Sequence, residues 1–265
     1  MVLEEEKSNE KVLSFWEHLE VLRWTIVRVI IVVTAFMTFF FSAKNFLFSK
    51  IIFPPLSSDF VIYKVMHWFS VKLNAPSLNP GSFHLQMINY NLSGQFMAHI
   101  STAFSIALIF SVPYILFEIW KFIGPALYMR ERKNVGLIFF SSSVLFYLGA
   151  AVSYFLVFPL TLRFLGTYQV SELVPNQISL ESYLSALYIL VFSLGIMFEL
   201  PVLVYFLSRI GILNRKMLKA ARNYAFVIIL IIAAIITPTT DPFTMMVVAL
   251  PIYLLYELSI LVCKK

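Results

Sequence analysis

The stretch FEIWKFIGPALYMRERKN, Phe117–Asn134, decides the fold because it puts six charged residues and a Gly-Pro pair between two long apolar runs. Each of those runs is long enough to cross a bilayer as a helix. Pro125 stops or kinks a helix because it has no backbone N–H and its ring clashes with the preceding turn. Trp120 and Tyr128 are residue types that gather at membrane interfaces. The stretch, called the elbow below, is therefore predicted to be a connection at a membrane surface.

The composition excludes an ordinary water-soluble globule. Hydrophobic residues make up 60% of the 265 residues, charged residues only 13%, and the mean hydropathy is +0.85. Charged residues account for about a quarter of a soluble domain. The length predicts one compact bundle, residues 1–265. The only cysteine, Cys263, excludes an internal disulfide, and the net charge of +6 fits loops that face anionic lipid, without nucleic acid as a partner.

The predicted fold class is an all-α integral membrane protein with six transmembrane helices. A span needs about 20 apolar residues, because the hydrocarbon core is about 30 Å thick and a helix rises about 1.5 Å per residue. The segments that we assign as spans are Trp24–Ser42, Phe96–Glu118, Val135–Pro159, Tyr183–Leu207, Tyr224–Ile236 and Phe243–Val262. The fifth is short, so the last pair is expected to need a locally thinned bilayer or snorkelling side chains. Kinked spans are expected at Pro113, Pro159, Pro201 and Pro251.

The distribution of Lys and Arg predicts that both termini lie in the cytoplasm. With six spans, one side of the membrane holds Lys7, Lys11, Arg23, Lys121, Arg130, Arg132, Lys133, Arg209, Arg215, Lys216, Lys219, Arg222, Lys264 and Lys265. The other side holds Lys44, Lys50, Lys64, Lys72 and Arg163, spread over a greater length of chain. Cytoplasmic loops carry the excess of cationic residues. The elbow is therefore assigned to the cytoplasmic side of an inner (cytoplasmic) cell membrane.

The segment 43–95 is predicted to form an external cap on the bundle. It is long and mixed in composition, with turn signals at Pro54-Pro55, Pro76 and Pro80-Gly81. We expect it to contain short amphipathic helices that lie at the membrane interface.

Several chemistries lack the residues that they need. The sequence has no phosphate-binding G-x-x-x-x-G-K-[ST] run, no H-E-x-x-H and no G-x-S-x-G. Its four histidines are scattered without the spacing of metal ligands. We therefore expect no enzyme activity, no metal and no cofactor. Any transport would draw its energy from a partner or from the membrane potential.

Glu131 is the residue of the elbow that topology does not explain. Its neighbours Arg130, Arg132 and Lys133 fit the cytoplasmic excess of cationic residues, to which acidic residues contribute little. Either Glu131 pairs with those neighbours, or it accepts a cation from outside the protein. If that cation is an arginine, the bonds can be bidentate.

The segment SFWEHLEVLRW, Ser14–Trp24, leads into the first span. Phe15, Leu19 and Leu22 recur at helical spacing, while Arg23 lies on another face. This pattern favours an amphipathic helix at the interface.

Glu199, in GIMFELPV, lies well inside the fourth span. A carboxylate at that depth is costly, which by default indicates a function. Pro201 would kink the helix and free carbonyl groups that need partners. The structural alternative is a protonated Glu199 that is bonded to a neighbouring helix.

A known family becomes recognisable at these residues. VPYILFEIWKFIGPALYMRERK (112–133) closely resembles the first cytoplasmic loop of TatC, the multispan subunit of the twin-arginine protein translocase. Further matches in the family's order are HLEVLR (18–23), YFLVFPL (154–160), FELPV (198–202), AIITPTTDPF (234–243) and ALPIYLLYELSI (249–260). The resemblance covers most of the chain and is weakest in segment 43–95.

The resemblance implies a receptor for signal peptides that carry two consecutive arginines. Such receptors have six spans, assemble with single-span TatA/TatB-type subunits and with further copies of themselves, and export folded proteins with the proton-motive force. In this chain the implied signal-peptide-binding residues are Glu131, Phe122 and, in the N-terminal motif, Glu20 and Arg23. The implied intramembrane functional residues are Glu199 and Pro201.

The N-terminal motif departs from the family pattern. The family has a glutamate directly before Leu-Arg, where this chain has Val21. Glu20 is one place earlier, about 100° round a helix. Either Glu20 reaches the same cation through a different rotamer, or another carboxylate, Glu17 or Glu118, takes that part.

The turn before the last span departs as well. The family's TPPDVFSQ is TPTTDPFTM here, with one more residue in the turn. Thr237 keeps its place, and Met245 stands where the family has a glutamine. The resemblance implies that these two positions contact a partner helix.

Other classes of function remain as alternatives. A proton-coupled secondary transporter would use Glu199 as an intramembrane relay, with a midplane site at broken helices of inverted repeats, but no repeat is apparent. An intramembrane hydrolase lacks its nucleophile motif, and a merely structural membrane protein is the remaining alternative.

Overall fold

The computed structural model describes residues 15–75, 81, 85–123, 135–171, 173, 176–239 and 241–263. The long helices are α1 (Phe15–Ser42), α4 (Gly94–Ile123), α6 (Val135–Val152), α7 (Phe158–Thr167), α8 (Leu180–Met197), α9 (Leu200–Arg209), α11 (Arg222–Ile236) and α12 (Pro242–Val262). Shorter elements are α2 (Lys44–Phe46), a π-helical turn (Leu47–Ile52), a 3₁₀ turn (Pro54–Leu56), α3 (Val61–Lys72) and α10 (Arg215–Ala220). Strands β1 (Gln86–Ile88) and β2 (Gln177–Ser179) form a parallel pair in which Gln86 is opposite Gln177.

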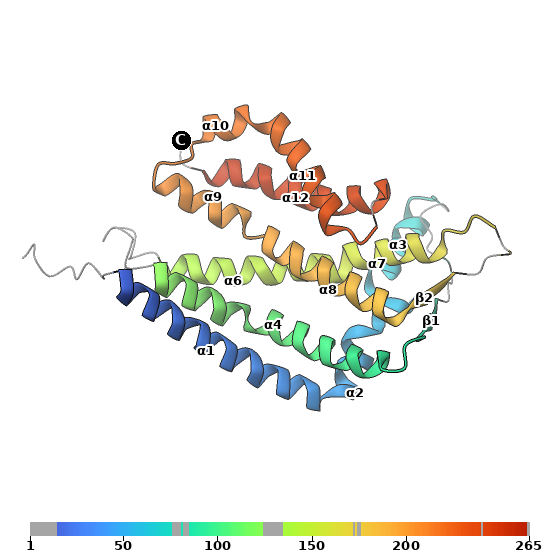
Figure 1. Cartoon of the computed structure of the whole chain (residues 1–265). Helices are drawn as coiled ribbons and strands as arrows, with labels where there is room; N and C mark the ends of the chain where they lie inside the picture. Colours follow the sequence, from blue (N-terminus) through green and yellow to red (C-terminus); the bar gives the residue numbers. More distant parts are fainter. Residues whose placement is uncertain are drawn as a thin grey trace, which may run out of the picture.

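The helices form an elongated bundle with two distinct ends (Figure 1). At one end α1 begins, α4 ends, α6 begins, and α9 and α12 end (Figure 1); this is called the elbow end. At the other end lie α2, α3 and the strand pair, and this is called the cap end (Figure 1). The first and last described helices thus begin and finish at the same end, as an even number of crossings requires.

The predicted all-α membrane fold with six candidate spans and bent helices is confirmed. By length and hydropathy the candidates are Leu19–Ser42, Lys44–Lys72, Gly94–Phe122, Ile138–Thr167, Leu180–Arg209 and Pro242–Val262. The first, third, fourth, fifth and sixth of these coincide with spans assigned from the sequence. The orientation of the bundle in the membrane stays a prediction.

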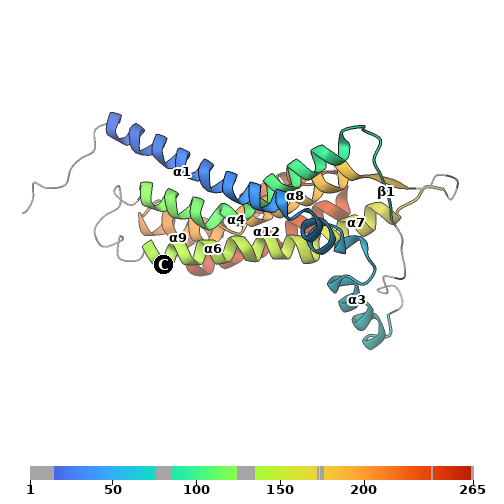
Figure 2. The same cartoon turned by 90° about the horizontal axis from the view of Figure 1, so that it is seen from below.

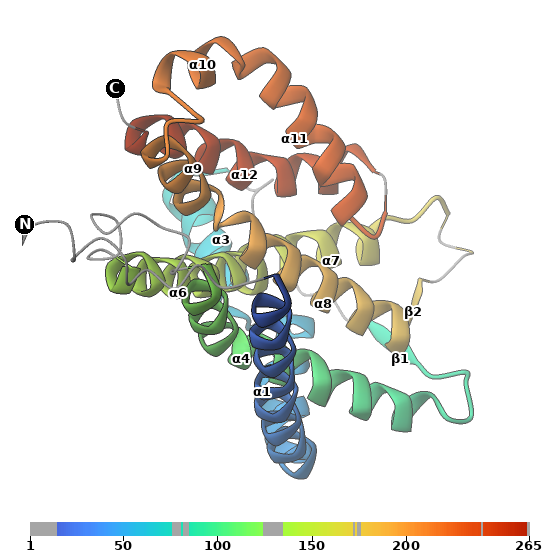
Figure 3. The same ribbon diagram turned by 60° about the vertical axis from the view of Figure 1, so that its left-hand side comes forward.

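One candidate span differs from the sequence assignment. Lys44–Lys72 qualifies by composition, but it is interrupted between its π-helical turn and α3, and α3 leaves the bundle sideways at the cap end (Figure 2). The predicted fifth span corresponds to α11, which has 15 residues and is therefore only about 22 Å long. In Figure 3, α11 lies beside α12, to which it connects. The external position of segment 43–95 stays a prediction.

The bends have local causes. Helix α6 passes into α7 through a π-helical turn, Ser153–Val157, with Pro159 in the first turn of α7. Between α8 and α9, Phe198 and Glu199 form a tighter turn in which the N–H of Glu199 donates to the carbonyl of Ile196. Pro201 follows and cannot donate to the carbonyl of Met197, as a helical N–H would. Both bends therefore coincide with a predicted proline, whereas Pro113 and Pro251 lie inside α4 and α12, which continue past them.

The core centres on α8, which packs against α4, α6, α11 and α12, and glycine allows the closest approach. An added Cβ at Gly149 of α6 would lie 2.7 Å from the carbonyl oxygen of Leu194 and 2.7 Å from Cγ of Phe198. A Cβ at Gly195 of α8 would lie 2.6 Å from the ring of Phe146. Close helix contacts at small residues are typical of membrane bundles. The two helices thus approach each other immediately before the bend at Glu199.

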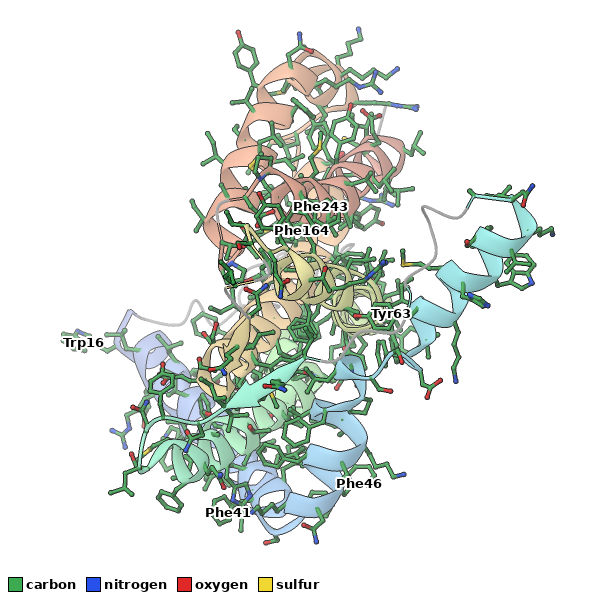
Figure 4. All side chains as sticks on the ribbon, turned by 90° about the vertical axis from the view of Figure 1, so that its right-hand side faces the viewer. Trp16, Phe41, Phe46, Tyr63, Phe164 and Phe243 are labelled. Atoms are coloured by element: carbon green, nitrogen blue, oxygen red, sulfur yellow. The ribbon has the colours of Figure 1, made fainter. Side chains whose placement is uncertain are left out.

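Aromatic side chains join the remaining elements to this core. Phe164 of α7 stacks on Phe243 of α12 with ring centroids 4.3 Å apart, and Figure 4 shows the two rings together. Trp16, in the first turn of α1, is 78% exposed and points outward (Figure 4). The segment that was expected to form an interfacial helix is the beginning of the same continuous helix as the first span, Phe15–Ser42, and its interfacial position stays a prediction.

Two tyrosine hydroxyls donate hydrogen bonds to backbone carbonyl groups that lack a backbone donor because prolines follow them in the chain. Pro54 and Pro55 have no N–H to offer to the carbonyls of Ile51 and Ile52. Instead, the hydroxyl of Tyr154 donates to the oxygen of Ile51 at 2.6 Å, and that of Tyr183 donates to the oxygen of Ile52 at 2.5 Å. These bonds fasten the chain after α1 to α8 and to the π-helical turn after α6.

Replacing Tyr183 by phenylalanine is expected to lower the free energy of unfolding by about 1–3 kcal/mol, because the buried oxygen of Ile52 loses its donor. Tyr224→Phe is the matched control, since Tyr224 is 75% exposed and its hydroxyl can bond to water. Thermal unfolding of both variants in the same detergent measures the effect. Equal midpoints for the two variants would contradict this role of Tyr183.

Candidate functional site

The elbow end gathers the residues to which the sequence analysis assigned binding. Glu131 itself lies in 124–134, outside the described residues, and its role stays a prediction. The residues that flank this segment, Ile123 at the end of α4 and Val135 at the start of α6, both lie at the elbow end (Figure 1). The helices that lead into and out of segment 124–134 therefore both meet it at the elbow end.

Three other predicted site residues come to the same end. Glu20 and Arg23 are exposed in the first turns of α1, and Phe122 is half-buried in the last turn of α4. The guanidinium of Arg23 lies 5.5 Å from the centre of the Trp24 ring, a cation–π contact. Helices α1 and α4 pack along each other (Figure 1). The structure thus brings Glu20, Arg23 and Phe122 to one end of one helix pair.

Glu118 is not open to an external cation. It is 3% exposed and forms a bidentate ion pair with Arg28 of α1. Arg28 Nε donates to Glu118 Oε1 at 2.9 Å, and Arg28 Nη2 donates to Oε2 at 2.8 Å. The hydroxyl of Tyr114 donates to Oε1 at 2.9 Å, and Thr25 is 3.5 Å from Oε2. The sequence-based option of Glu118 as the second arginine-binding carboxylate is therefore disfavoured by the geometry.

The sequence analysis missed this ion pair, although a signal was present. Arg28 lies within the predicted first span, Trp24–Ser42, and Glu118 is the last residue of the predicted second span, Phe96–Glu118. Opposite charges within two consecutive spans, both near the same membrane surface, are expected to pair because unpaired charges there are costly. A second such pair joins the last helices: Arg222 Nη2 of α11 lies 2.6 Å from Glu257 Oε2 of α12.

Glu199 lies at the bend between α8 and α9, as predicted. Its Oε1 atom is buried and has no hydrogen-bond partner among the described residues, while the side chain interacts with buried Ser142 of α6. None of the ion pairs within the described ranges includes Glu199. Pro201 is buried directly after it. The site is a polar interruption of an apolar bundle, with a hydroxyl nearby.

The turn between α11 and α12 holds the two residues predicted to contact a partner helix. Thr237 is buried, and its hydroxyl donates to the carbonyl of Ala234 at 3.3 Å. Met245 is half-buried and packs against the core. Asp241 caps α12: its Oδ1 accepts from the N–H of Thr244 at 2.8 Å, and its Oδ2 accepts from the hydroxyl of Thr239 at 2.6 Å.

The pKa of Asp241 makes this cap sensitive to pH. Burial favours the neutral acid, but the hydrogen bonds from Thr239 and Thr244 outweigh it and hold the pKa below its usual value. A carboxylate whose folded pKa is depressed stabilises the fold above its unfolded pKa, and this contribution is lost as the pH falls through the folded pKa.

Replacing Asp241 by alanine is expected to lower the stability by about 1 kcal/mol near neutral pH, because α12 loses its N-cap. Asp241→Asn keeps the cap without a titrating group, so its stability near pH 7 should resemble that of the unmodified chain. Thermal unfolding is measured at pH values from about 7 down to about 3. The difference in stability between the unmodified chain and the alanine variant should become smaller as the pH falls. A difference that stays constant over this range would exclude a titrating cap.

The part of the chain that the structure describes holds no cluster of three His, Cys, Asp or Glu side chains able to bind a metal. The long apolar helices, bent at prolines and joined by ion pairs at one end, define the class: a multi-pass α-helical membrane protein.

Comparisons with known proteins identify the family. The model of the family described as "Sec-independent protein translocase protein (TatC)" matches residues 17–251. The chain is 34% identical over 256 residues to TatC of Blattabacterium sp. subsp. Periplaneta americana (strain BPLAN), and the match covers 96% of each chain. It is 42% identical over 168 residues to TatC of Helicobacter pylori (strain J99 / ATCC 700824), which covers 63% of this chain and 67% of that relative.

A crystal structure of the twin-arginine translocase receptor TatC in DDM matches with a TM-score of 0.70 at 30% sequence identity, covering 94% of this chain and 100% of the other. The chain belongs to the TatC family. It is therefore a subunit of the Sec-independent, twin-arginine protein translocase and works in a complex with other components of that machine. Family membership does not favour the proton-coupled transporter.

Proposed function

We propose that this chain receives twin-arginine signal peptides at the elbow end of its bundle. Glu131 and a carboxylate in the first turns of α1 bind the two guanidinium groups, with Phe122 and Arg23 beside them. The observation that supports this proposal is the common position of the start of α1, the end of α4 and the start of α6 (Figure 1). These elements bring Glu20 and Phe122 to the end where the segment with Glu131 is attached.

The elbow end faces the cytoplasm in this proposal, and the protein is a multi-pass protein of the inner (cytoplasmic) cell membrane. The described cationic residues at that end are Arg23, Lys121, Arg209, Arg215, Lys216, Lys219 and Arg222. The cap end has the fewer cationic residues, and they are spread over α2, α3, α7 and the π-helical turn. The excess of Lys and Arg marks the cytoplasmic side, where a signal peptide arrives. Segment 43–95 is then an external cap.

The chemistry of such a site explains a preference for arginine. A guanidinium presents donors in a rigid fork that matches a carboxylate, whereas a lysine ammonium is a single strongly hydrated charge. Each charge-assisted bond contributes about 1.5–3 kcal/mol. Two fixed carboxylates therefore select a pair of arginines over a pair of lysines, and the apolar part of the peptide lies along the bundle.

The remaining predicted residues serve the later steps in this proposal. Thr237 and Met245, at the turn between α11 and α12, contact a single-span TatA/TatB-type partner at the cap end. Glu199 and Pro201 supply the polar interruption that the bundle uses during transport. Folded cargo crosses with the proton-motive force in a larger complex that contains further copies of this chain, with membrane lipid around it.

Site-specific photocrosslinking tests the proposal. A photoreactive residue at Lys121, which is exposed at the elbow end, should capture a peptide with consecutive arginines and not its lysine counterpart. The same residue at Val170, which is 92% exposed beyond α7, is the matched control at the cap end. Capture at position 170 and not at 121, or equal capture of both peptides, would rule the proposal out.

A further inference from the structure

The Arg28–Glu118 ion pair holds α1 and α4 together through a buried carboxylate. Glu118 is buried, and only Arg28 has an exposed part, 39% of its side chain. Two parallel N–H···O bonds fix the plane of the guanidinium against the plane of the carboxylate, which a single bond does not. Each helix adds a second polar group, Thr25 from α1 and Tyr114 from α4. The cluster therefore sets both the height and the rotation of α1 on α4.

The cluster lies close to the proposed binding site without belonging to it. Glu118 is five residues before the end of α4 at Ile123, or about 8 Å along the helix. Glu20 is eight residues before Arg28, or about 12 Å along α1. The first turns of α1 thus extend beyond the ion pair toward the elbow, and their direction depends on how the pair holds the helix.

The rotation that the pair imposes also decides where the described side chains of the first turns of α1 lie around the helix. At about 100° per residue, position 21 lies within about 20° of Arg28, whereas position 20 lies about 80° away. Val21 occupies the position nearer to Arg28, and Glu20 is exposed beside it. The direction in which Glu20 projects therefore depends on how the pair holds α1.

We propose that Arg28 and Glu118 are positioning residues for the signal-peptide site: their ion pair fixes the rotation of α1 on α4 and so sets the direction in which Glu20 and Arg23 project at the elbow end. This inference rests on the proposed function of the elbow end. The pair does not touch the peptide and acts only through the placement of α1.

The experiment separates placement from binding. Nitroxide labels at Leu19→Cys and Ile119→Cys, both at exposed positions, in a Cys263→Ser background report the distance between α1 and α4. In unlabelled protein, a fluorescent twin-arginine peptide reports affinity. The distance between α1 and α4 and the peptide affinity are measured for Glu118→Gln, for Arg28→Gln and for the double variant that exchanges the two residues, Arg28→Glu with Glu118→Arg. Glu257→Gln breaks an Arg–Glu pair of similar length in other helices at the same end and is the matched control.

Glu118→Gln and Arg28→Gln should broaden the distance distribution and weaken peptide binding on the order of tenfold, as expected for coupling through a packed helix pair. The exchange should restore both in part, and Glu257→Gln should change neither.

Unchanged distances in Glu118→Gln and Arg28→Gln would overturn the positioning role directly. Altered distances with unchanged peptide affinity would reduce the pair to a structural contact and overturn the inference as well. If the unmodified protein itself does not prefer the arginine peptide, the proposed function fails, and the distances still decide whether the pair positions α1.

Discussion

Replacing Gly149 by valine is expected to destabilise the chain by several kcal/mol and to leave little folded protein in the membrane. Even the first added atom, Cβ, would lie 2.7 Å from the carbonyl oxygen of Leu194 and 2.8 Å from Cβ of Phe198. These atoms belong to a helix backbone and to the base of a ring, so they cannot move aside as the end of a flexible side chain could. Overpacking usually costs about 1–3 kcal/mol, and more when the backbone must shift. Yield after detergent extraction and thermal unfolding measure the effect.

Gly136→Val is the matched control, because nothing lies within 4 Å of an added Cβ at Gly136, in the same helix. That variant should be at least as stable as the unmodified chain, since valine is a better helix former than glycine. Gly195→Val should resemble Gly149→Val, because its Cβ would meet the ring of Phe146 at 2.6 Å. A Gly149→Val protein as stable as Gly136→Val would show that α6 and α8 do not meet in the way described.

Replacing Glu131 by alanine is expected to weaken binding of a twin-arginine peptide by about 10- to 150-fold. The estimate follows from the loss of charge-assisted bonds that contribute about 1.5–3 kcal/mol. The unfolding temperature should stay near that of the unmodified chain. Fluorescence anisotropy of a labelled peptide, titrated with protein in lipid nanodiscs, measures the affinity.

Glu181→Ala provides the control for the loss of one carboxylate. Glu181 is exposed in the first turn of α8 at the cap end, where it bonds to Asn91. Peptide affinity should be unchanged in this variant. If Glu131→Ala and Glu181→Ala bind the peptide equally well, Glu131 has no part in recognition and the proposed site loses its central residue.

The sequence predicts the helices of the bundle better than the cap. Long apolar runs need no tertiary information, because a bilayer imposes both the length and the closed hydrogen bonding of a helix. Prolines at 159 and 201 likewise identify the two bends from chemistry alone, whereas Pro251 lies inside α12, which continues past it. Segment 43–95 is different, because its path depends on distant partners such as Tyr154 and Tyr183. No local sequence pattern predicts those contacts.

The site is predictable in its residue types and less so in its pairings. Glu20, Arg23 and Phe122 were expected at one end of the bundle and lie there. The parallel strand pair was not expected, because each strand has only three residues and no turn signal links one strand to the other. The Arg28–Glu118 pair was missed because the two residues are 90 positions apart, although they belong to consecutive spans and lie near the same membrane surface.

The hydrogen bond from Tyr183 to Ile52 has a consequence for biosynthesis. The two residues are 131 positions apart, and a ribosome adds about 5–20 residues per second, so the carbonyl of Ile52 waits roughly 7–26 s for its donor. During that interval the chain between α1 and α4 lacks its bond to α8. This part of the protein therefore reaches its final packing only after α8 has been synthesised.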